Sequence, residues 1–173
     1  PAALEVKIRV PTNAKSFSFN FNFYTYEWPS FVCSNYNDFF AALQTPAPPN
    51  AALGNISFDS QGNPVSVNNA FLDACGCSTG APCTAKGKVF NCSLGTKILE
   101  GTGFAEPITY PHAATGWLET KSPVTPGSEV TLRFAIWDAG DHVLDSTVLI
   151  DKFVFSAEEA TGGSTTKPVP TPK

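Results

Sequence analysis

The stretch Ser16-Phe-Ser-Phe-Asn-Phe-Asn-Phe23 decides the fold class, because a polar residue and a phenylalanine alternate along its whole length. Successive side chains of a β-strand point to opposite faces of a sheet. An extended conformation therefore places all four phenylalanines on one face and the serines and asparagines on the other. This pattern predicts an outer strand of a sandwich whose aromatic face lies in the core.

Further strand-like segments follow along the chain. Leu4 to Val10 alternates apolar with polar residues, as a half-buried strand does. Clusters of Pro, Gly and Asn separate the other segments and predict turns. No segment has a helical period, and no internal repeat is present. We therefore expect an all-β protein, a two-sheet antiparallel β-sandwich of jelly-roll type. Its further strands are expected at 38–43, 55–60, 65–67, 116–120, 130–136 and 147–155.

The composition agrees with this class and excludes several partners. Charged residues make up 15% of the 173 residues, aromatic residues make up 12%, and there are 13 Gly and 15 Pro. Such a chain fits one domain of short strands joined by turns. The net charge is −4 and no basic cluster is present, which argues against nucleic acid and anionic membranes as partners. No apolar run approaches the roughly 18 residues that span a bilayer.

The domain organisation follows from the same changes in composition. We expect one β-sandwich domain over residues 1–159, with a Cys-rich insert at about 73–103. Residues 160–173 are rich in Pro, Thr and Gly and have no apolar period, so they predict an extended linker or stalk. The chain contains no Met and begins at Pro1. It is therefore expected to be a processed product or a piece of a longer protein.

Five cysteines, four of them between Cys75 and Cys92, favour disulfides and an oxidising, extracellular compartment. Structural zinc is a poorer match, because its ligands usually come as pairs two to four residues apart. Cys33 and Cys75 each end a strand-like segment, so we predict that they pair. Cys77 and Cys83 can close a short loop, which leaves Cys92 free or bonded elsewhere.

The chain has few residues and motifs suited to catalysis. We therefore predict a protein that is not an enzyme and has no catalytic residues. Its only histidines are His112 and His142, and no serine lies in a G-x-S-x-G motif. His142, Asp145 and Ser146 are neighbours in one loop, whereas the members of a working triad usually come from separate elements.

Two acidic loops, about a hundred residues apart, predict a calcium site. Both loops are bounded by strand-like sequence, so rigid strands could hold them at one end of the sandwich. Converging carboxylates repel each other unless a cation lies between them, and ligation by oxygen alone suits Ca²⁺ best. The alternative is that Asp138-Ala-Gly-Asp141 is a simple tight turn. The predicted ligands are Glu27, Asn37 and Asp38 in the first loop and Asp138, Asp141 and Asp145 in the second.

Three ordered segments resemble the choice-of-anchor L domain family, in a version most like those of myxobacterial secreted proteins. The first runs from Phe21 through Glu27-Trp-Pro to Asn37-Asp38. The second comprises Asn55-Ile-Ser and Pro64-Val-Ser-Val-Asn68. The third runs from Pro126-Gly through Ala-Ile-Trp-Asp138-Ala-Gly-Asp141 to Asp145-Ser146. The resemblance spans roughly residues 3–155. One departure is Tyr24-Thr-Tyr26, which stands where a Ser is usual before Glu27.

This resemblance implies a bacterial extracellular or cell-surface protein with no enzymatic activity to carry over. It also implies that the predicted calcium ligands and Ser146 are positions of the family pattern. We therefore expect a calcium-stabilised module for surface display or adhesion, whose partner is a surface glycan, a protein or copies of itself. One alternative is a carbohydrate-binding module in which Trp28, Trp117 and Trp137 stack on sugar rings. Another is a subunit of a fibre or sheath that assembles by strand addition.

Overall fold

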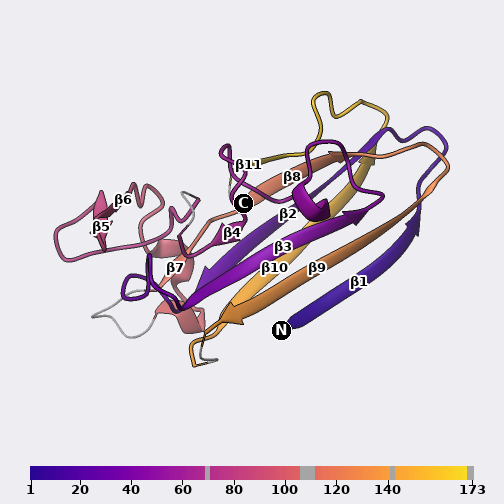
Figure 1. Cartoon of the computed structure of the whole chain (residues 1–173). Coiled ribbons are helices and arrows are strands. Elements are labelled where there is room, and N and C mark those ends of the chain that lie inside the picture. Colours follow the sequence, from indigo (N-terminus) through magenta and orange to yellow (C-terminus); the bar gives the residue numbers. More distant parts are fainter. Residues whose placement is uncertain (69–70, 106–111, 141–142, 171–173) are drawn as a thin grey trace.

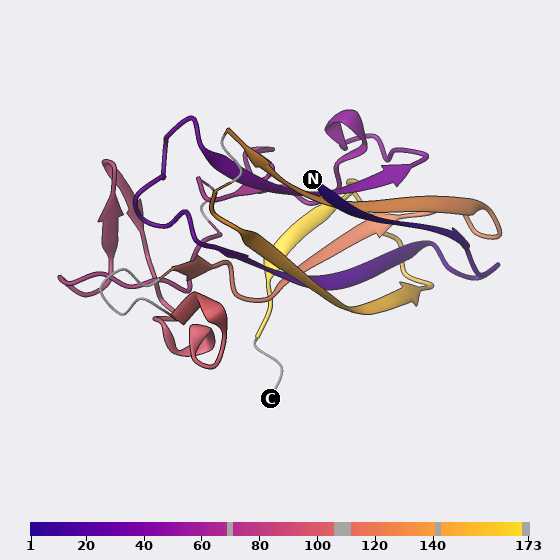
Figure 2. The same cartoon turned by 90° about the horizontal axis from the view of Figure 1, so that it is seen from below.

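The computed structural model describes residues 1–68, 71–105, 112–140 and 143–170. Two antiparallel sheets lie face to face, as Figures 1 and 2 show from two directions. The two-sheet β-sandwich that the sequence predicts is therefore confirmed, while its jelly-roll character stays a prediction. The first sheet has the order β1 (Ala2–Arg9), β9 (Glu129–Ala139), β3 (Asn37–Thr45), β4 (Val65–Ser66). The second sheet has the order β10 (Ser146–Ser156), β2 (Ser16–Thr25), β8 (Leu118–Pro123), β11 (Thr165–Pro168), and β7 (Ala113–Ala114) also pairs with β2.

The phenylalanine face of β2 forms the centre of the core. All four of its rings are fully buried. Phe19 meets Phe134 of β9 edge-on at a centroid distance of 5.1 Å, and Phe21 lies 4.8 Å from Phe40 of β3. The predicted core position is confirmed, but the predicted outer position is wrong, since β2 lies between β10 and β8.

The polar face of β2 is also covered. Asn22 is 1% exposed, and its Nδ2 donates a hydrogen bond of 3.0 Å to the hydroxyl oxygen of Tyr24. The Tyr24 ring packs against Phe104 of the Cys-rich insert at 5.3 Å. Burial raises the pKa of the Tyr24 hydroxyl. Amide and hydroxyl groups thus satisfy each other where the insert excludes water.

The other strands agree with the sequence except at 55–60. Among the described residues, that segment makes two isolated bridges, Leu43 with Asn55 and Phe58 with Pro64. Asp59 Oδ1 accepts hydrogen bonds from the backbone N–H groups of Gln61 and Asn63, both at 2.9 Å. This carboxylate closes a tight turn and ends any extended conformation there. The short 3₁₀ turns are η1 (Ala52–Gly54), η2 (Lys97–Leu99) and η3 (Gly103–Ala105).

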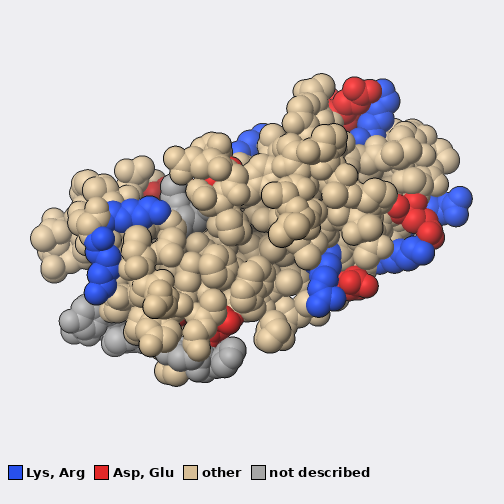
Figure 3. All heavy atoms as spheres, in the orientation of Figure 1, with Lys and Arg blue, Asp and Glu red and all other residues tan. Residues whose placement is uncertain are grey.

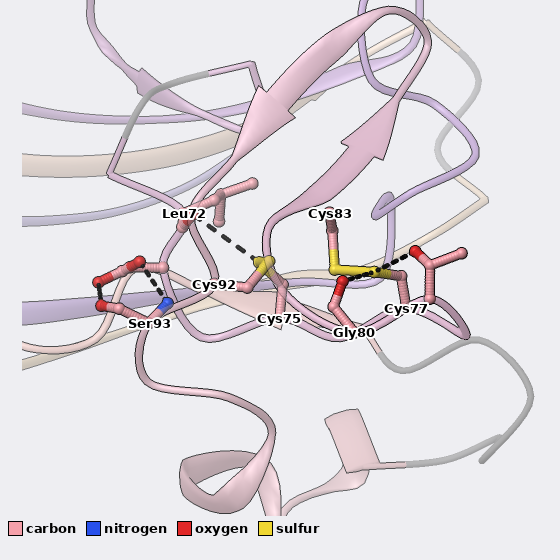
Figure 4. The surroundings of a disulfide bond; sticks show 9 residues. Leu72, Cys75, Cys77, Gly80, Cys83, Cys92 and Ser93 are labelled. Atoms are coloured by element: carbon pink, nitrogen blue, oxygen red, sulfur yellow. Dashed lines mark hydrogen bonds between the residues drawn. A yellow bond between two sulfur atoms is a disulfide. The ribbon is translucent and has the colours of Figure 1, made fainter.

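The Cys-rich insert contains a small hairpin, β5 (Cys83–Ala85) and β6 (Lys88–Phe90), with two disulfides at its base (Figure 4). One joins Cys77 to Cys83, as the sequence predicts. The other joins Cys75 to Cys92, so the predicted pairing of Cys75 with Cys33 is wrong. Cys33 is exposed and unpaired.

Local hydrogen bonds explain why Cys75 pairs with Cys92 and not with Cys33. The backbone N–H of Leu94 donates a hydrogen bond of 3.1 Å to the carbonyl oxygen of Asp73. The backbone N–H of Ser93 donates one of 2.8 Å to the Asp73 carboxylate. These bonds align the two segments and bring the Cα atoms of Cys75 and Cys92 to 4.9 Å, a usual disulfide distance. The insert then packs on the β2–β3 loop, where Phe90 meets Trp28 edge-on at 4.6 Å.

The C-terminal residues 164–168 belong to the sandwich, which differs from the expected linker over 160–173. β11 pairs with β8 from Thr165 opposite Lys121 to Pro168 opposite Leu118. Ser164 is 2% exposed and exchanges two hydrogen bonds with the Asn50 side chain, at 2.7 and 2.8 Å. Hydroxyl groups continue this contact inward, since Ser164 Oγ lies 2.8 Å from Ser122 Oγ.

Removing β11 is therefore expected to lower stability. Ending the chain after Glu159 removes the pairing with β8 and the bonds to Asn50. The loss should be on the order of 2 kcal/mol, because a net hydrogen bond contributes about 1 kcal/mol. Urea unfolding of this variant, beside a control that ends after residue 170, measures the difference. Equal stability of the two would restore the interpretation of the segment as a linker.

Candidate cation site at one end of the sandwich

Three acidic side chains meet where β2 ends and β3 begins. Asp38 of β3 lies directly opposite Asp138 of β9 in the register of the first sheet. Glu27 follows the end of β2, in a turn held by hydrogen bonds from Glu27 N to Thr25 Oγ1 at 3.0 Å and from Phe31 N to Glu27 O at 2.9 Å. One carboxylate oxygen from each of the three residues lies within 4.8 Å of the others.

The spacing of these oxygens fits a single cation. Calcium binds oxygen at 2.3–2.6 Å, so two of its ligands lie at most about 5 Å apart. Glu27 and Asp38 are each 1% exposed, and Asp138 is half-buried. Little water therefore screens the charges of these carboxylates from one another. The cluster can perform the chemistry of a hard-cation site.

The start of β10 also lies at this cluster. Ser146 Oγ donates a hydrogen bond to Asp38 Oδ2, and Tyr26 N donates to the carbonyl oxygen of Asp145 at 3.2 Å. A cavity of about 230 Å³ opens beside the cluster, with Asp38, Asp138, Asp145 and Ser146 in its lining. It offers room for an ion to enter with water molecules as further ligands.

The other predicted ligands divide into three cases. Asn37 begins β3 and is 8% exposed, and within the described part of the chain its Oδ1 accepts no hydrogen bond. Asp145 is exposed and lines the cavity. Asp141 lies outside the described residues. The structure thus brings Glu27, Asp38 and Asp138 together.

Ser146 is the contact that sequence reasoning did not assign to the site. Its hydroxyl contacts a carboxylate more than a hundred residues away in the chain. The only sequence signal for it was its position beside Asp145 in the family pattern. A hydroxyl at the first residue of a strand carries no general signal for such a contact.

The three tryptophans differ in what they offer to a sugar ring. Trp28 is 2% exposed and packed against Phe90, so it presents no face, and its predicted stacking role is wrong. Trp137 is half-buried, stacks on Phe39 at 5.4 Å and borders the cavity. Trp117 is half-buried, and its carbonyl oxygen accepts a hydrogen bond from Val169 N at 2.9 Å.

The chain has two histidines, His112 and His142. His112 packs edge-on against Tyr26 at 4.2 Å, and its Nδ1 lies 3.2 Å from the Tyr26 carbonyl oxygen. His142 lies outside the described residues.

Comparison with known proteins assigns the chain to a family. No curated protein and no solved structure matches it. In the part of the chain that the structure describes, no helix is long and apolar enough to cross a membrane. The family model of the choice-of-anchor L domain matches residues 3–156, a range that contains Glu27, Asp38, Asp138 and Ser146. The match indicates a surface-associated bacterial module, and the two disulfides fit an extracellular location. Because the match covers nearly the whole chain, the protein belongs to the choice-of-anchor L domain family.

Proposed function

We propose that this protein is a non-enzymatic adhesion module of the bacterial surface whose loop end is stabilised by one Ca²⁺ ion. The observation that carries the proposal is the meeting of Glu27, Asp38 and Asp138, whose carboxylate oxygens lie within 4.8 Å of one another. Asn37, Asp141 and Asp145 are further candidate ligands in the same two segments.

An ion at this position would connect the two sheets. Glu27 follows β2 of the second sheet, whereas Asp38 and Asp138 belong to the first. The ion would also fix the β2–β3 loop, against which the disulfide-bonded insert packs through Trp28 and Phe90. Calcium would thereby hold in place the end of the sandwich that carries the largest loops, and loops on a rigid scaffold are where binding residues concentrate.

The ligand chemistry favours calcium over other divalent ions. Carboxylate, amide and hydroxyl oxygens suit hard cations, whereas zinc and copper prefer nitrogen and sulfur. Magnesium demands nearly ideal octahedral geometry, while calcium accepts six to eight ligands in irregular arrangements. A site assembled from two strands, one turn and an open cavity supplies the irregular kind.

Calcium addition tests the proposal directly. A ligand that binds only the folded state should stabilise it by about 2.7 kcal/mol at a hundred times its dissociation constant. The melting temperature should therefore rise when chelator is replaced by millimolar calcium, and elemental analysis should find calcium in the purified protein. Identical melting curves under the two conditions would contradict the proposal, and magnesium at the same concentration is the control.

The partner bound at this end is proposed to be a surface glycan or a surface protein. A glycan is supported by Trp137, whose half-buried ring borders the same cavity as Asp145. Partly exposed aromatic rings beside polar groups are suited to sugar recognition. Retention on glycan affinity gels would separate a carbohydrate ligand from a protein ligand.

A further inference from the structure

The four edges of the two sheets differ in how well they resist pairing with another strand. β10 carries a register shift between Asp151 and Val154, with Lys152 at a φ of 54°. β4 has two residues, and β11 has four and ends in a proline. Bulges, short length, proline and charged side chains are the usual means of blocking an edge. β1 keeps one uninterrupted register with β9 from Ala2 to Arg9, and of these features it has only the charged side chains Glu5, Lys7 and Arg9.

The side chains of β1 divide cleanly between its two faces. Val6 and Ile8 pack against the core, and Leu4 is on the same face but is 58% exposed. On the other face, Glu5 lies 3.4 Å from Arg133 and Lys7 lies 2.9 Å from Glu129, both on β9. Figure 3 shows basic and acidic groups side by side in the region where Figure 1 places β1.

This alternation makes β1 complementary to itself. In an antiparallel pair of two β1 strands centred on Val6, Glu5 lies opposite the partner's Lys7, and Leu4 lies opposite the partner's Ile8. A slip of one residue would place apolar residues opposite charged ones and turn the inner face outward. A slip of two residues would place either Lys7 opposite Lys7 or Glu5 opposite Glu5, and like charges in opposite positions destabilise a pair.

We propose that two copies of this chain pair through β1 and form a closed dimer with two-fold symmetry, in which the first sheets of both copies join. The charged face then continues across the interface in alternating sign: Arg133, Glu5, the partner's Lys7, the partner's Glu129. The same patch serves on both copies, so the contact closes after two chains and does not propagate.

The second sheet presents its edge strand β10 near β1, since β9, the neighbour of β1, contacts β10. Four apolar side chains of β10 are 36–48% exposed, but they lie on both faces of the second sheet. Ile150 lies opposite Phe21 and Phe153 stacks on Phe17, whereas Leu149 and Val154 lie opposite Asn22 and Ser18 on the outer face. The pairing of β1 therefore does not depend on these side chains.

Charge reversal tests both the surface and the register. Sedimentation velocity of the wild-type chain over a range of concentrations should show a monomer–dimer equilibrium that weakens when salt is raised. Glu5→Lys and Lys7→Glu should each weaken the dimer about tenfold or more, because each places like charges opposite one another at both ends of the pair. An equimolar mixture of the two variants should regain dimers, since all the opposing charges are then of opposite sign.

The control is Lys15→Glu, which breaks a comparable exposed ion pair with Glu159 at 2.9 Å, away from β1. It should leave the dimer unchanged. A wild-type chain that stays monomeric at 0.5 mM, or a dimer that neither variant weakens, would overturn the proposal. Species that keep growing with concentration would also overturn it, since they indicate open-ended addition. Recovery in the mixture shows in addition that both variants are folded.

Discussion

An Asp38→Asn variant will be less stable than the wild type in millimolar calcium and more stable than the wild type in chelator. With calcium, the loss of one charged ligand should remove most of the stabilisation of about 2.7 kcal/mol that a saturating ion supplies. Without calcium, the same change removes one of three mutually repelling carboxylates and thereby relieves the folded state. The asparagine keeps an oxygen that can accept the hydrogen bond from Ser146 Oγ.

Urea unfolding in the two buffers measures the free energy of unfolding with and without calcium, and so tests both expected changes. The matched control is Asp151→Asn, which changes an exposed aspartate of β10 outside the cluster and should respond to calcium as the wild type does. A calcium response of equal size in wild type and Asp38→Asn would show that Asp38 is not a ligand. A variant that is less stable in both buffers would indicate a purely structural role.

Replacing Cys75 and Cys92 together with serine should lower stability by about 3 kcal/mol. The disulfide closes a loop with a sequence separation of 17, and removing it restores that loop's entropy to the unfolded chain. Both sulfurs are buried with Trp28 and Phe90, so the insert should also pack more loosely on the β2–β3 loop.

Two comparisons make the disulfide prediction specific. The Cys77–Cys83 bond has a sequence separation of 6, and its removal should cost less, roughly 2.4 kcal/mol. Cys33→Ser should cost almost nothing, because Cys33 is exposed and unpaired. Peptide mapping under non-reducing conditions checks the pairing itself. A Cys33–Cys75 peptide, or a large loss of stability in Cys33→Ser, would contradict the structure.

The elements that the sequence predicted correctly are those whose pattern is visible within their own residues. The alternating phenylalanines of β2 reveal their buried face without any knowledge of their partners, because the period of a strand is a property of the strand. The acidic cluster was partly predictable for the same reason, since Glu27, Asp38 and Asp138 each lie where a strand-like segment meets a loop. That Asp38 and Asp138 lie directly opposite each other depends on the register of β3 and β9. Register is set by the whole sheet.

The wrong predictions concern structure that depends on contacts between residues far apart in the sequence. β11 has no apolar period, and it is held by hydroxyl contacts such as Thr166 Oγ1 to Thr120 Oγ1 at 2.9 Å, which leave no signature in its own sequence. Pairing of Cys75 with Cys92 follows from hydrogen bonds around Asp73, which strand ends alone did not indicate. Trp28 is one of the three tryptophans predicted to stack on sugar rings, yet the insert covers it.

The two disulfides of the insert have a consequence for when the protein reaches its final form. Thiols stay reduced in a bacterial cytoplasm and are oxidised outside it. The sandwich core depends on no disulfide, whereas the insert that covers Trp28 is joined by both bonds. A chain kept in a reducing environment would therefore carry its β-sheets while the insert over Trp28 still lacks the two bonds that close it. Formation of these bonds then becomes the last step in the maturation of this end of the molecule.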